Sequence, residues 1–547
     1  MTGDEVVAKI LKAEGVEWLS CFPAQTLIDA ASKEGIRPIL CRQERAGVNM
    51  ADGYSRVNNG KKIGVFTMQT GPGAENAFGG VAQGFADSVP ILLLPGGQPS
   101  LRMGVPPNFE AAPNYRGITK WAGLINMAER IPEMLSRAFT HLKHGRLGPV
   151  LLELPRDIAT ATFPHDTFTY MPVKVMKSGA APEDVRDLVA ALLQASNPII
   201  NAGQGVLYAD ATAELIAFAE LTHIPVMTTL AGKSAFPETH RLALGTGASS
   251  GTQMVHDFLQ ATDFVLGLGT SFTLSNFNAP MPTHLPLAQV TNCPEDVNKD
   301  YRISYGAIGD AKIVLQQMLE EAKRQLGAKG REDVNDVVAA IEKSKAAFMA
   351  EWGPRLMSDE VPISPYRVIH ELAKNVDVAN TIVTHDSGYP REQMVPFWQP
   401  VTPRGYLGWG KSTQLGYGLG LAMGAKLAAP HKTVVNVMGD AAFGMAGMDI
   451  ETAARSGIGT LTIILNNGVM THYYDHFPHA AKHWGSNKLG GHYAKVAEGL
   501  GAYAERVETP DQVSPAIQRG LAATKKGQPA VLEMITKEEE TIPRYWR

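Results

Sequence analysis

The sequence has few cysteines, no large excess of charge of one sign and no long apolar run, and each shortage excludes a class of protein. Cys21, Cys41 and Cys293 are the only cysteines among 547 residues, too few and too scattered for a disulfide framework or a structural zinc site. The formal net charge of −4 provides no basic surface for nucleic acid. The longest apolar runs, such as 89–95, are too short to span a bilayer. We therefore expect neither nucleic acid nor a membrane as partner.

The amino terminus and the composition are typical of an ordinary globular protein. The opening MTGDEVVAKILKAEGV is an amphipathic helical pattern with charges throughout, unlike a secretion signal. Hydrophobic residues make up 44% of the chain and charged residues 19%. Together with the scarcity of cysteine, these features predict a cytoplasmic protein. The length predicts about three or four domains, and no short tandem repeat indicates a solenoid.

Short apolar runs alternate with helical patterns in three blocks of similar size. The first block, 1–165, contains RPILC and PILLLPG; the second, 183–330, contains NPIINAG and DFVLGLG; the third, 363–547, contains NTIVTHD and TLTIILNN. Residues 166–182 indicate a linker, and a charged stretch from about 330 to 360 indicates a helical connector. Because strands and helices alternate, we predict three consecutive α/β domains, each with a doubly wound parallel sheet.

The stretch 433–468 predicts a strand, a helix and a second strand. Its first apolar run ends in Gly439-Asp440 and its second ends in Asn466-Asn467. Helical spacing is shown by four apolar residues between the runs, namely Ala446, Ile450, Ala453 and Ala454. Right-handed crossovers make such strands parallel, so Asp440 and Asn467 should both lie at carboxyl ends, where open α/β sheets bind ligands. A carboxylate, an amide oxygen and free backbone N–H groups suit a divalent cation that carries a diphosphate.

Two other glycine-rich patterns are weaker. GYLGWGKST at 405–413 satisfies the phosphate-loop pattern, but the preceding PFWQPVTPR is rich in proline and polar residues where a buried strand is required. NAGQGV from Asn201 lacks the full spacing and the acidic partner of a dinucleotide fingerprint. We therefore expect no nucleotide hydrolysis at 405–413.

In the first block, RPILCRQERAGVNMADGYSR places Glu44 directly after a strand, in the first turn of a helix. Small or apolar residues form one face of that helix, namely Ala46, Met50, Gly53 and Tyr54. A glutamate in a first helical turn is favourable to the helix dipole, so by itself it does not indicate a function.

The Gly-Asp pair followed 27 residues later by an Asn pair resembles the cofactor motif of thiamine diphosphate enzymes. Over nearly the whole chain, the three blocks are similar to the pyrimidine-binding, central and diphosphate-binding domains of the acetolactate synthase-like group, which includes pyruvate decarboxylase. The resemblance implies thiamine diphosphate and Mg²⁺ as cofactors. It implies Asp440, the Asn467 side chain and the Val469 carbonyl as metal ligands. Glu44 falls in the phrase where the family places the glutamate that activates the cofactor by hydrogen bonding to its aminopyrimidine.

The resemblance implies further cofactor contacts. Leu415 would be the apolar wedge between the two cofactor rings, and the Thr413 carbonyl would accept a hydrogen bond from the aminopyrimidine. HDSG at 385–388 corresponds to the family segment that binds diphosphate oxygens, which implicates Asp386, Ser387 and Gly388. The other predicted contacts to the cofactor are Gly439, Ala441, Ala442 and Met470.

For the substrate, the resemblance implies a pocket formed by 23–26, 69–73 and 470–476. Gln25 can orient a substrate, but its amide does not exchange protons at neutral pH. His472, or alternatively His476, is the candidate for acid–base catalysis, because histidine titrates in the useful range. THYYDHFPHAAKHW contains four histidines, but their irregular spacing and the lack of cysteines disfavour a structural zinc.

The chain departs from acetolactate synthases in two places. Their FQE segment is replaced by Phe109-Glu110-Ala111. Their flavin-binding central domain has a basic and acidic patch where this chain has GTSFTLSNF from Gly269, and an expected acid is replaced by Asn292. The resemblance allows FAD in the central domain, whereas these residues disfavour it.

The resemblance implies a transferase or lyase that decarboxylates a 2-oxo acid and joins the product to a second carbonyl compound. An alternative on the same scaffold is a lyase that cleaves a 2-hydroxy ketone or a 2-hydroxyacyl-CoA thioester without releasing carbon dioxide. An alternative of another class is a regulatory homologue that binds the cofactor without turnover. In the family, the counterpart of Glu44 faces the diphosphate domain of another subunit, which implies a homo-oligomer, at least a dimer.

Overall fold

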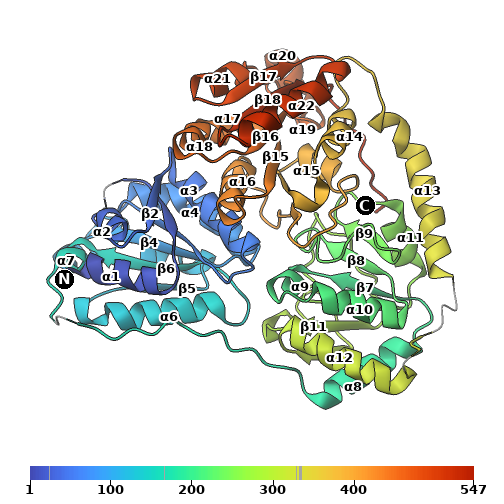
Figure 1. The fold of residues 1–547 in the computed structure, drawn as a ribbon, viewed down its shortest axis with the longest axis horizontal. Coiled ribbons are helices and arrows are strands. Elements are labelled where there is room, and N and C mark those ends of the chain that lie inside the picture. The colour runs from blue at the N-terminus through green and yellow to red at the C-terminus, as the bar shows by residue number, and fades with distance from the viewer. Residues whose placement is uncertain (24, 165–166, 328, 332–335, 547) are drawn as a thin grey trace.

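A computed structural model describes residues 1–23, 25–164, 167–327, 329–331 and 336–546. Three parallel six-stranded sheets follow one another along the chain, each within one predicted block (Figure 1). The predicted fold class is therefore confirmed. The domain boundaries stay predictions, and positions 165, 328 and 547 lie outside the described residues.

The first sheet has the order β2-β1-β3-β4-β6-β5. Separate apolar clusters cover its two faces: Leu92 and Leu94 of β4 belong to one, and Ile91 and Leu93 to the other. Alternate residues of one strand thus enter opposite cores, which explains why the run is apolar throughout. The strands are β1 (Trp18–Cys21), β2 (Arg37–Leu40), β3 (Gly64–Met68), β4 (Ile91–Gly97), β5 (Trp121–Leu124) and β6 (Val150–Pro155). The helices are α1 (Gly3–Ala13), α2 (Leu27–Lys33), α3 (Glu44–Val57), α4 (Pro72–Ala86), α5 (Ala111–Asn114), α6 (Ile131–Lys143) and α7 (Arg156–Thr160).

The central sheet has the order β12-β11-β10-β7-β8-β9. The predicted linker is irregular over 167–181, and the predicted helical connector is α13 (Val337–Leu356). The strands are β7 (Pro198–Ala202), β8 (Val226–Thr229), β9 (Ala243–Gly247), β10 (Phe264–Leu268), β11 (Leu287–Thr291) and β12 (Tyr305–Ile308). The helices are α8 (Pro182–Gln194), α9 (Gln204–Tyr208), α10 (Thr212–Thr222), α11 (Gln253–Ala261) and α12 (Ala311–Leu326).

The third sheet has the order β14-β13-β15-β16-β18-β17. Its strands are β13 (Thr381–His385), β14 (Tyr406–Leu407), β15 (Thr433–Gly439), β16 (Leu461–Asn466), β17 (Tyr503–Val507) and β18 (Ala530–Ile535). The helices are α14 (Pro365–Asn375), α15 (Tyr389–Met394), α16 (Tyr417–Ala428), α17 (Asp440–Ala446), α18 (Ile450–Ser456), α19 (Tyr473–His476), α20 (Pro478–Trp484), α21 (Tyr493–Gly499) and α22 (Pro510–Thr524). Within the described ranges, no helix is both long and apolar enough to cross a bilayer.

The first and third domains are joined through α3 and α16, which lie side by side in Figure 1. Their backbones approach closely because glycines face the partner helix. A Cβ atom on Gly424 would overlap the carbonyl oxygen of Met50, and one on Gly53 would overlap that of Leu421. Met50 and Tyr54 of α3 also share an apolar cluster with Leu419 and Met423 of α16. This contact fixes the position of the first domain on the third domain.

We predict that Gly424→Ala lowers the midpoint of thermal unfolding, because the added methyl group forces α3 and α16 apart at a cost of about 1–3 kcal/mol. The matched control is Gly353→Ala in α13, where a Cβ atom meets no heavy atom within 4 Å. There the better helix propensity of alanine should add about 1 kcal/mol of stability. Equal midpoints for the two variants would contradict the close packing of α3 and α16.

Candidate active site

The predicted strand–helix–strand unit holds Asp440 and the Asn pair at the same edge of the third sheet. β15 and β16 are parallel neighbours, Asp440 begins α17 and Asn466 ends β16. The Asp440 carboxylate accepts the N–H of Ala441 (2.8 Å) and that of Gly468 (2.9 Å). The helix that we expected to run without a break is divided, because α17 ends at Ala446, a 3₁₀ turn covers 447–449 and α18 follows.

The two asparagines have different contacts. Asn466 donates to the buried carboxylate of Glu533 (2.8 Å), which also accepts from Arg506 (2.8 Å). Asn467 donates to the hydroxyl of Thr471 (2.9 Å), and its amide oxygen accepts the N–H of Val469 (3.1 Å). Asn466 therefore connects the end of β16 to Glu533 of β18, whereas Asn467 bonds within the loop 467–471. The role of Glu533 was missed by sequence reasoning, although a single acid inside the apolar run PAVLEMI is a detectable signal.

The donor set of this loop fits a magnesium ion. The Asp440 carboxylate, the Asn467 amide oxygen and the Val469 carbonyl would offer hard oxygen ligands, which are the kind that Mg²⁺ prefers. Burial raises the pKa of Asp440 above its ordinary value, although the N–H groups that it accepts oppose this shift. The described residues contain no cluster of three His, Cys, Asp or Glu side chains that would form a metal site of another kind.

Glu44 is the first residue of α3 and is buried, with 4% of its surface exposed. Its carboxylate accepts from the Asn76 amide (3.3 Å) on α4, and a Cβ atom on Gly73 would lie 3.5 Å from it. Tyr115 is close behind, donating to the Ala74 carbonyl, and burial together with the charge of Glu44 raises its pKa. Asn76 and Tyr115 are further residues at this position that the sequence did not point to.

The amino end of α3 lies against α17 within one chain. Gln43 and Arg45, which flank Glu44, both donate to the Met445 carbonyl (3.0 and 3.1 Å). The N–H of Arg42 donates to Asp449 (2.8 Å). The residue predicted to activate the cofactor and the helix that starts at Asp440 are therefore parts of one contiguous region.

The loop 408–416 lies between α4 and α17. A Cβ atom on Gly79 of α4 would overlap the Gln414 amide, and one on Gly416 would lie 3.1 Å from the Ala446 side chain. Thr413 and Leu415 therefore lie in a loop between the two domains, and their contacts with the cofactor stay predictions. As expected, the geometry is not that of a phosphate loop, since β14 falls inside the motif and α16 begins six residues after Lys411.

Asp386 binds backbone donors of its own domain, and its predicted contact with diphosphate stays a prediction. Its carboxylate is fully buried and accepts the N–H groups of Ser387 (2.8 Å), Gly416 (2.9 Å) and Gly418 (2.9 Å). Burial raises its pKa to about 6. Asp386 thus fixes the start of α16. Gly388 remains exposed, and a Cβ atom there would meet nothing within 4 Å, so its backbone is open to a ligand.

The predicted substrate residues come from both domains. Gln25 donates to the Met68 carbonyl (2.9 Å) and packs on Gly96; its neighbour Ala24 lies outside the described residues. His472 adopts a left-handed backbone conformation (φ +68°), and its ring lies 5.3 Å from that of Tyr389, directly after Gly388. The N–H of Met470 donates to the Asn487 carbonyl (2.7 Å). His472 thus lies beside the predicted diphosphate segment.

The four clustered histidines do not converge on one point. The rings of His479 and His483 stack on α20 with centroids 4.1 Å apart, whereas His476 contacts Tyr473 and the His472 carbonyl. This arrangement is consistent with the expectation that they form no structural zinc site.

A cavity of about 430 Å³ lies at the carboxyl ends of the central strands, where the resemblance would place FAD. Its volume is within the range of ligand pockets. Thr270 of the Gly269 segment and Asn292, the two departures from the family pattern, line it together with Arg146 and Lys411. The Asn292 amide donates to the Gly145 carbonyl (3.0 Å). FAD therefore stays an expectation that these wall residues disfavour.

Comparisons with known proteins cover nearly the whole chain. Models of thiamine pyrophosphate enzymes match the N-terminal TPP binding domain at 1–114, the central domain at 185–318 and the C-terminal TPP binding domain at 386–534. The chain is 30% identical over 545 residues to the probable acetolactate synthase large subunit of Methanococcus aeolicus, a match that covers 95% of this chain and 90% of the relative.

Two further relatives are similar over comparable lengths. The acetolactate synthase large subunit of Haemophilus influenzae is 28% identical over 550 residues (96% and 93% coverage). The glyoxylate carboligase of Escherichia coli O157:H7 is 29% identical over 562 residues (97% and 93% coverage). Thiamine pyrophosphate is another name for thiamine diphosphate, so the predicted family is confirmed. The chain belongs to the thiamine pyrophosphate enzyme family, and within it to the acetolactate synthase-like group.

Proposed function

We propose that this enzyme uses thiamine diphosphate and Mg²⁺ to decarboxylate a 2-oxo acid and to join the product to a second carbonyl compound. The observation that carries the proposal is that the chain matches all three thiamine pyrophosphate enzyme domains and holds Asp440 beside the Asn466-Asn467 turn, through the bond from the Gly468 N–H to Asp440 (2.9 Å). Its three cysteines are free thiols, which supports a reducing cytoplasm as its location.

Each part of the site has a separate task in this proposal. Asp440, Asn467 and Val469 hold the metal and thereby the diphosphate, while Gly388 leaves backbone open to it. Glu44 would hydrogen-bond to the aminopyrimidine, the Thr413 carbonyl would accept from its amino group and Leu415 would lie between the two cofactor rings. When bound, thiamine diphosphate supplies a nucleophilic carbon and stabilises the negative charge left when carbon dioxide departs.

The substrate is held and protonated by the chain's own residues. The Gln25 amide, anchored by its donation to Met68, orients the substrate through its remaining hydrogen-bonding capacity. His472 exchanges protons with the substrate, because an imidazole is the side chain that titrates near neutral pH. One ring nitrogen of His472 lies 3.8 Å from the Asp475 carboxylate.

We predict that Glu44→Gln lowers turnover by roughly 10²–10⁴-fold, the usual contribution of a positioned acid–base group. The assay measures carbon dioxide release and acyloin formation from a panel of 2-oxo acids, with and without aldehyde acceptors. The control is Glu133→Gln, an exposed glutamate in the first turn of α6, which should leave turnover unchanged.

The same panel separates the alternatives. Cleavage of 2-hydroxy ketones or thioesters without carbon dioxide would indicate a lyase instead. Turnover that survives Glu44→Gln undiminished would contradict the mechanism, and a wild-type protein inactive on every substrate would support a regulatory homologue.

Asp440→Ala should weaken thiamine diphosphate binding in the presence of Mg²⁺ by roughly 100-fold or more, since even outer partners of metal ligands contribute 10–100-fold. Calorimetric titration with and without EDTA measures the dissociation constant. Asp511→Ala, which removes an exposed acid from the first turn of α22, is the control and should bind normally. Binding by Asp440→Ala that is as tight and as sensitive to EDTA as in the wild type would exclude Asp440 as a ligand.

We further propose that the enzyme is a homodimer, at least. Besides the resemblance, exposed apolar side chains near the site support this: Phe78 and Phe85 of α4 are 39% and 40% exposed, and Met445 and Met448 are 50% and 51% exposed. A second copy of this chain would remove such apolar surface from water. The resemblance also implies that Glu44 of one subunit faces the diphosphate domain of another.

Mixing Glu44→Gln chains with Asp440→Ala chains should restore roughly a quarter of the wild-type rate, because half of randomly paired dimers are mixed and each has one intact site of two. Sedimentation equilibrium provides the control, with an expected mass of twice 58.9 kDa or a higher multiple. A monomer would refute the dimer, while a dimer without restored activity would place each site within one chain.

A further inference from the structure

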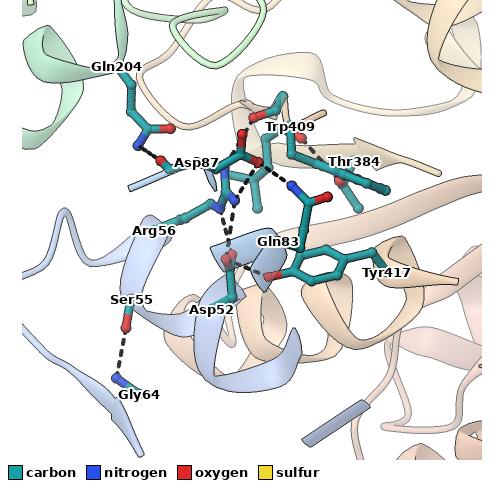
Figure 2. Close-up of polar contacts among 12 residues, drawn as sticks. Asp52, Ser55, Arg56, Gly64, Gln83, Asp87, Gln204, Thr384, Trp409 and Tyr417 are labelled. Atoms are coloured by element: carbon teal, nitrogen blue, oxygen red, sulfur yellow. Dashed lines mark hydrogen bonds and ion pairs between the residues drawn. The ribbon is translucent and has the colours of Figure 1, made fainter. Parts of the chain in front are cut away.

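A buried guanidinium and two carboxylates form a cluster next to the loop 408–416 (Figure 2). Arg56 of α3 bonds to Asp52, one turn earlier, and to Asp87 (3.1 Å), which follows α4. All three are buried, with exposed fractions of 1%, 0% and 3%. Burial opposes the charge of Arg56, but the two carboxylates outweigh it and raise the pKa of Arg56 well above its ordinary value. The guanidinium of Arg56 therefore stays charged.

Asp87 extends this cluster to the third domain. Its carboxylate accepts the N–H groups of Gly410 and Lys411 (both 3.3 Å) and the amide of Gln83 (2.8 Å). Arg56 reaches the same loop by donating to the Gly408 carbonyl (3.2 Å). One carboxylate of the first domain thus accepts hydrogen bonds from two backbone N–H groups of the loop 408–416.

The loop is held on its other side as well. Trp409 donates its indole N–H to the His385 carbonyl (2.9 Å) and stacks on that imidazole. Asp386 accepts from Gly416, and Tyr417 donates to Asp52 (2.7 Å). Residues 412–415, which include Thr413 and Leu415, lie between these two anchored ends and are partly exposed. These contacts therefore determine the position of Thr413 and Leu415, while both residues remain partly exposed.

The central domain attaches to the same point. Gln204 of α9 donates to the backbone carbonyl of Asp87 (2.9 Å), and Lys411 donates to the hydroxyl of Ser271 (3.2 Å). Asp87 of the first domain thus bonds both to the central domain, through Gln204, and to the loop 408–416 of the third domain.

The chemistry requires a carboxylate at position 87. Asp87 receives hydrogen bonds only from N–H groups, and an asparagine would present its own NH₂ to some of them. It would also leave Arg56 with one counter-charge fewer in a buried setting. A buried donor left without an acceptor costs about 1–3 kcal/mol, enough to shift the loop to other conformations.

We propose that Asp87 is a positioning residue for the cofactor, which holds the loop 408–416 in its receptive conformation before thiamine diphosphate binds. This inference rests on the proposed roles of Thr413 and Leu415. It adds that their position is determined from the first domain, by a residue that does not itself contact the cofactor.

The test is Asp87→Asn in the full-length protein. Amide hydrogen exchange of 408–416 without cofactor should accelerate roughly tenfold or more, and the dissociation constant for thiamine diphosphate should rise by a similar factor. In steady-state kinetics, the apparent KM for thiamine diphosphate should rise while kcat at saturation stays near the wild-type value, because saturating cofactor restores the loop.

The matched control is Asp449→Asn. Asp449 is also a buried carboxylate that accepts an N–H across the same two domains, from Arg42 (2.8 Å), but its bonds do not involve the loop. Its exchange should change at 42–44 and not at 408–416. If Asp87→Asn does not fold, Gln83→Met decides instead, because it removes the buried amide that donates to Asp87 (2.8 Å) and accepts the N–H of Gln414 (3.5 Å), and it keeps the side-chain volume.

Exchange of 408–416 that is unchanged, or changed equally in Asp449→Asn, would overturn the proposal, as would an unchanged dissociation constant. These measurements need no substrate. A wild-type protein without turnover on any 2-oxo acid would therefore refute the proposed function and leave this test intact.

Discussion

The backbone contact between α3 and α16 is the constraint on which the rest of the structure depends. Glycines at Gly53 and Gly424 let the two helices approach until carbonyl oxygens occupy the space of side chains. Arg56 lies at the far end of α3, and its bonds to Asp52 and Asp87 continue the same interface. Burying charged groups is unfavourable unless they are hydrogen-bonded, and the bonds of Arg56 to Asp52 and Asp87 meet this requirement at the interface.

The two halves of the site are built with different physics. The proposed metal site depends on local geometry, since Asp440 and Gly468 are joined by one hydrogen bond across neighbouring strands. Glu44 instead depends on long-range packing, because its position follows from where α3 meets α4 and α17. The first half is a property of one domain, and the second exists only when the domains are docked.

Several buried acids act on the backbone and leave ligand binding to their neighbours. Asp386 caps the start of α16, Asp87 holds the loop before it and Glu533 braces Asn466. Burial in each case is offset by N–H donors that converge on the carboxylate.

The sequence by itself determined the α/β class, the buried central strands and the Gly-Asp and Asn-Asn pairs, because apolar runs and turn residues act over short distances. It did not indicate the edge strands β5, β9, β12, β14 and β17, nor β1 inside the first sheet, because runs of two to five residues give only a weak apolar pattern. Glu44 was found through its family phrase, since a glutamate in a first helical turn has an ordinary explanation. Only the tertiary structure decided the roles of Asp386 and Asp87. Asp87 reaches a loop 324 residues away, and no local pattern encodes which backbone donors such a carboxylate will meet.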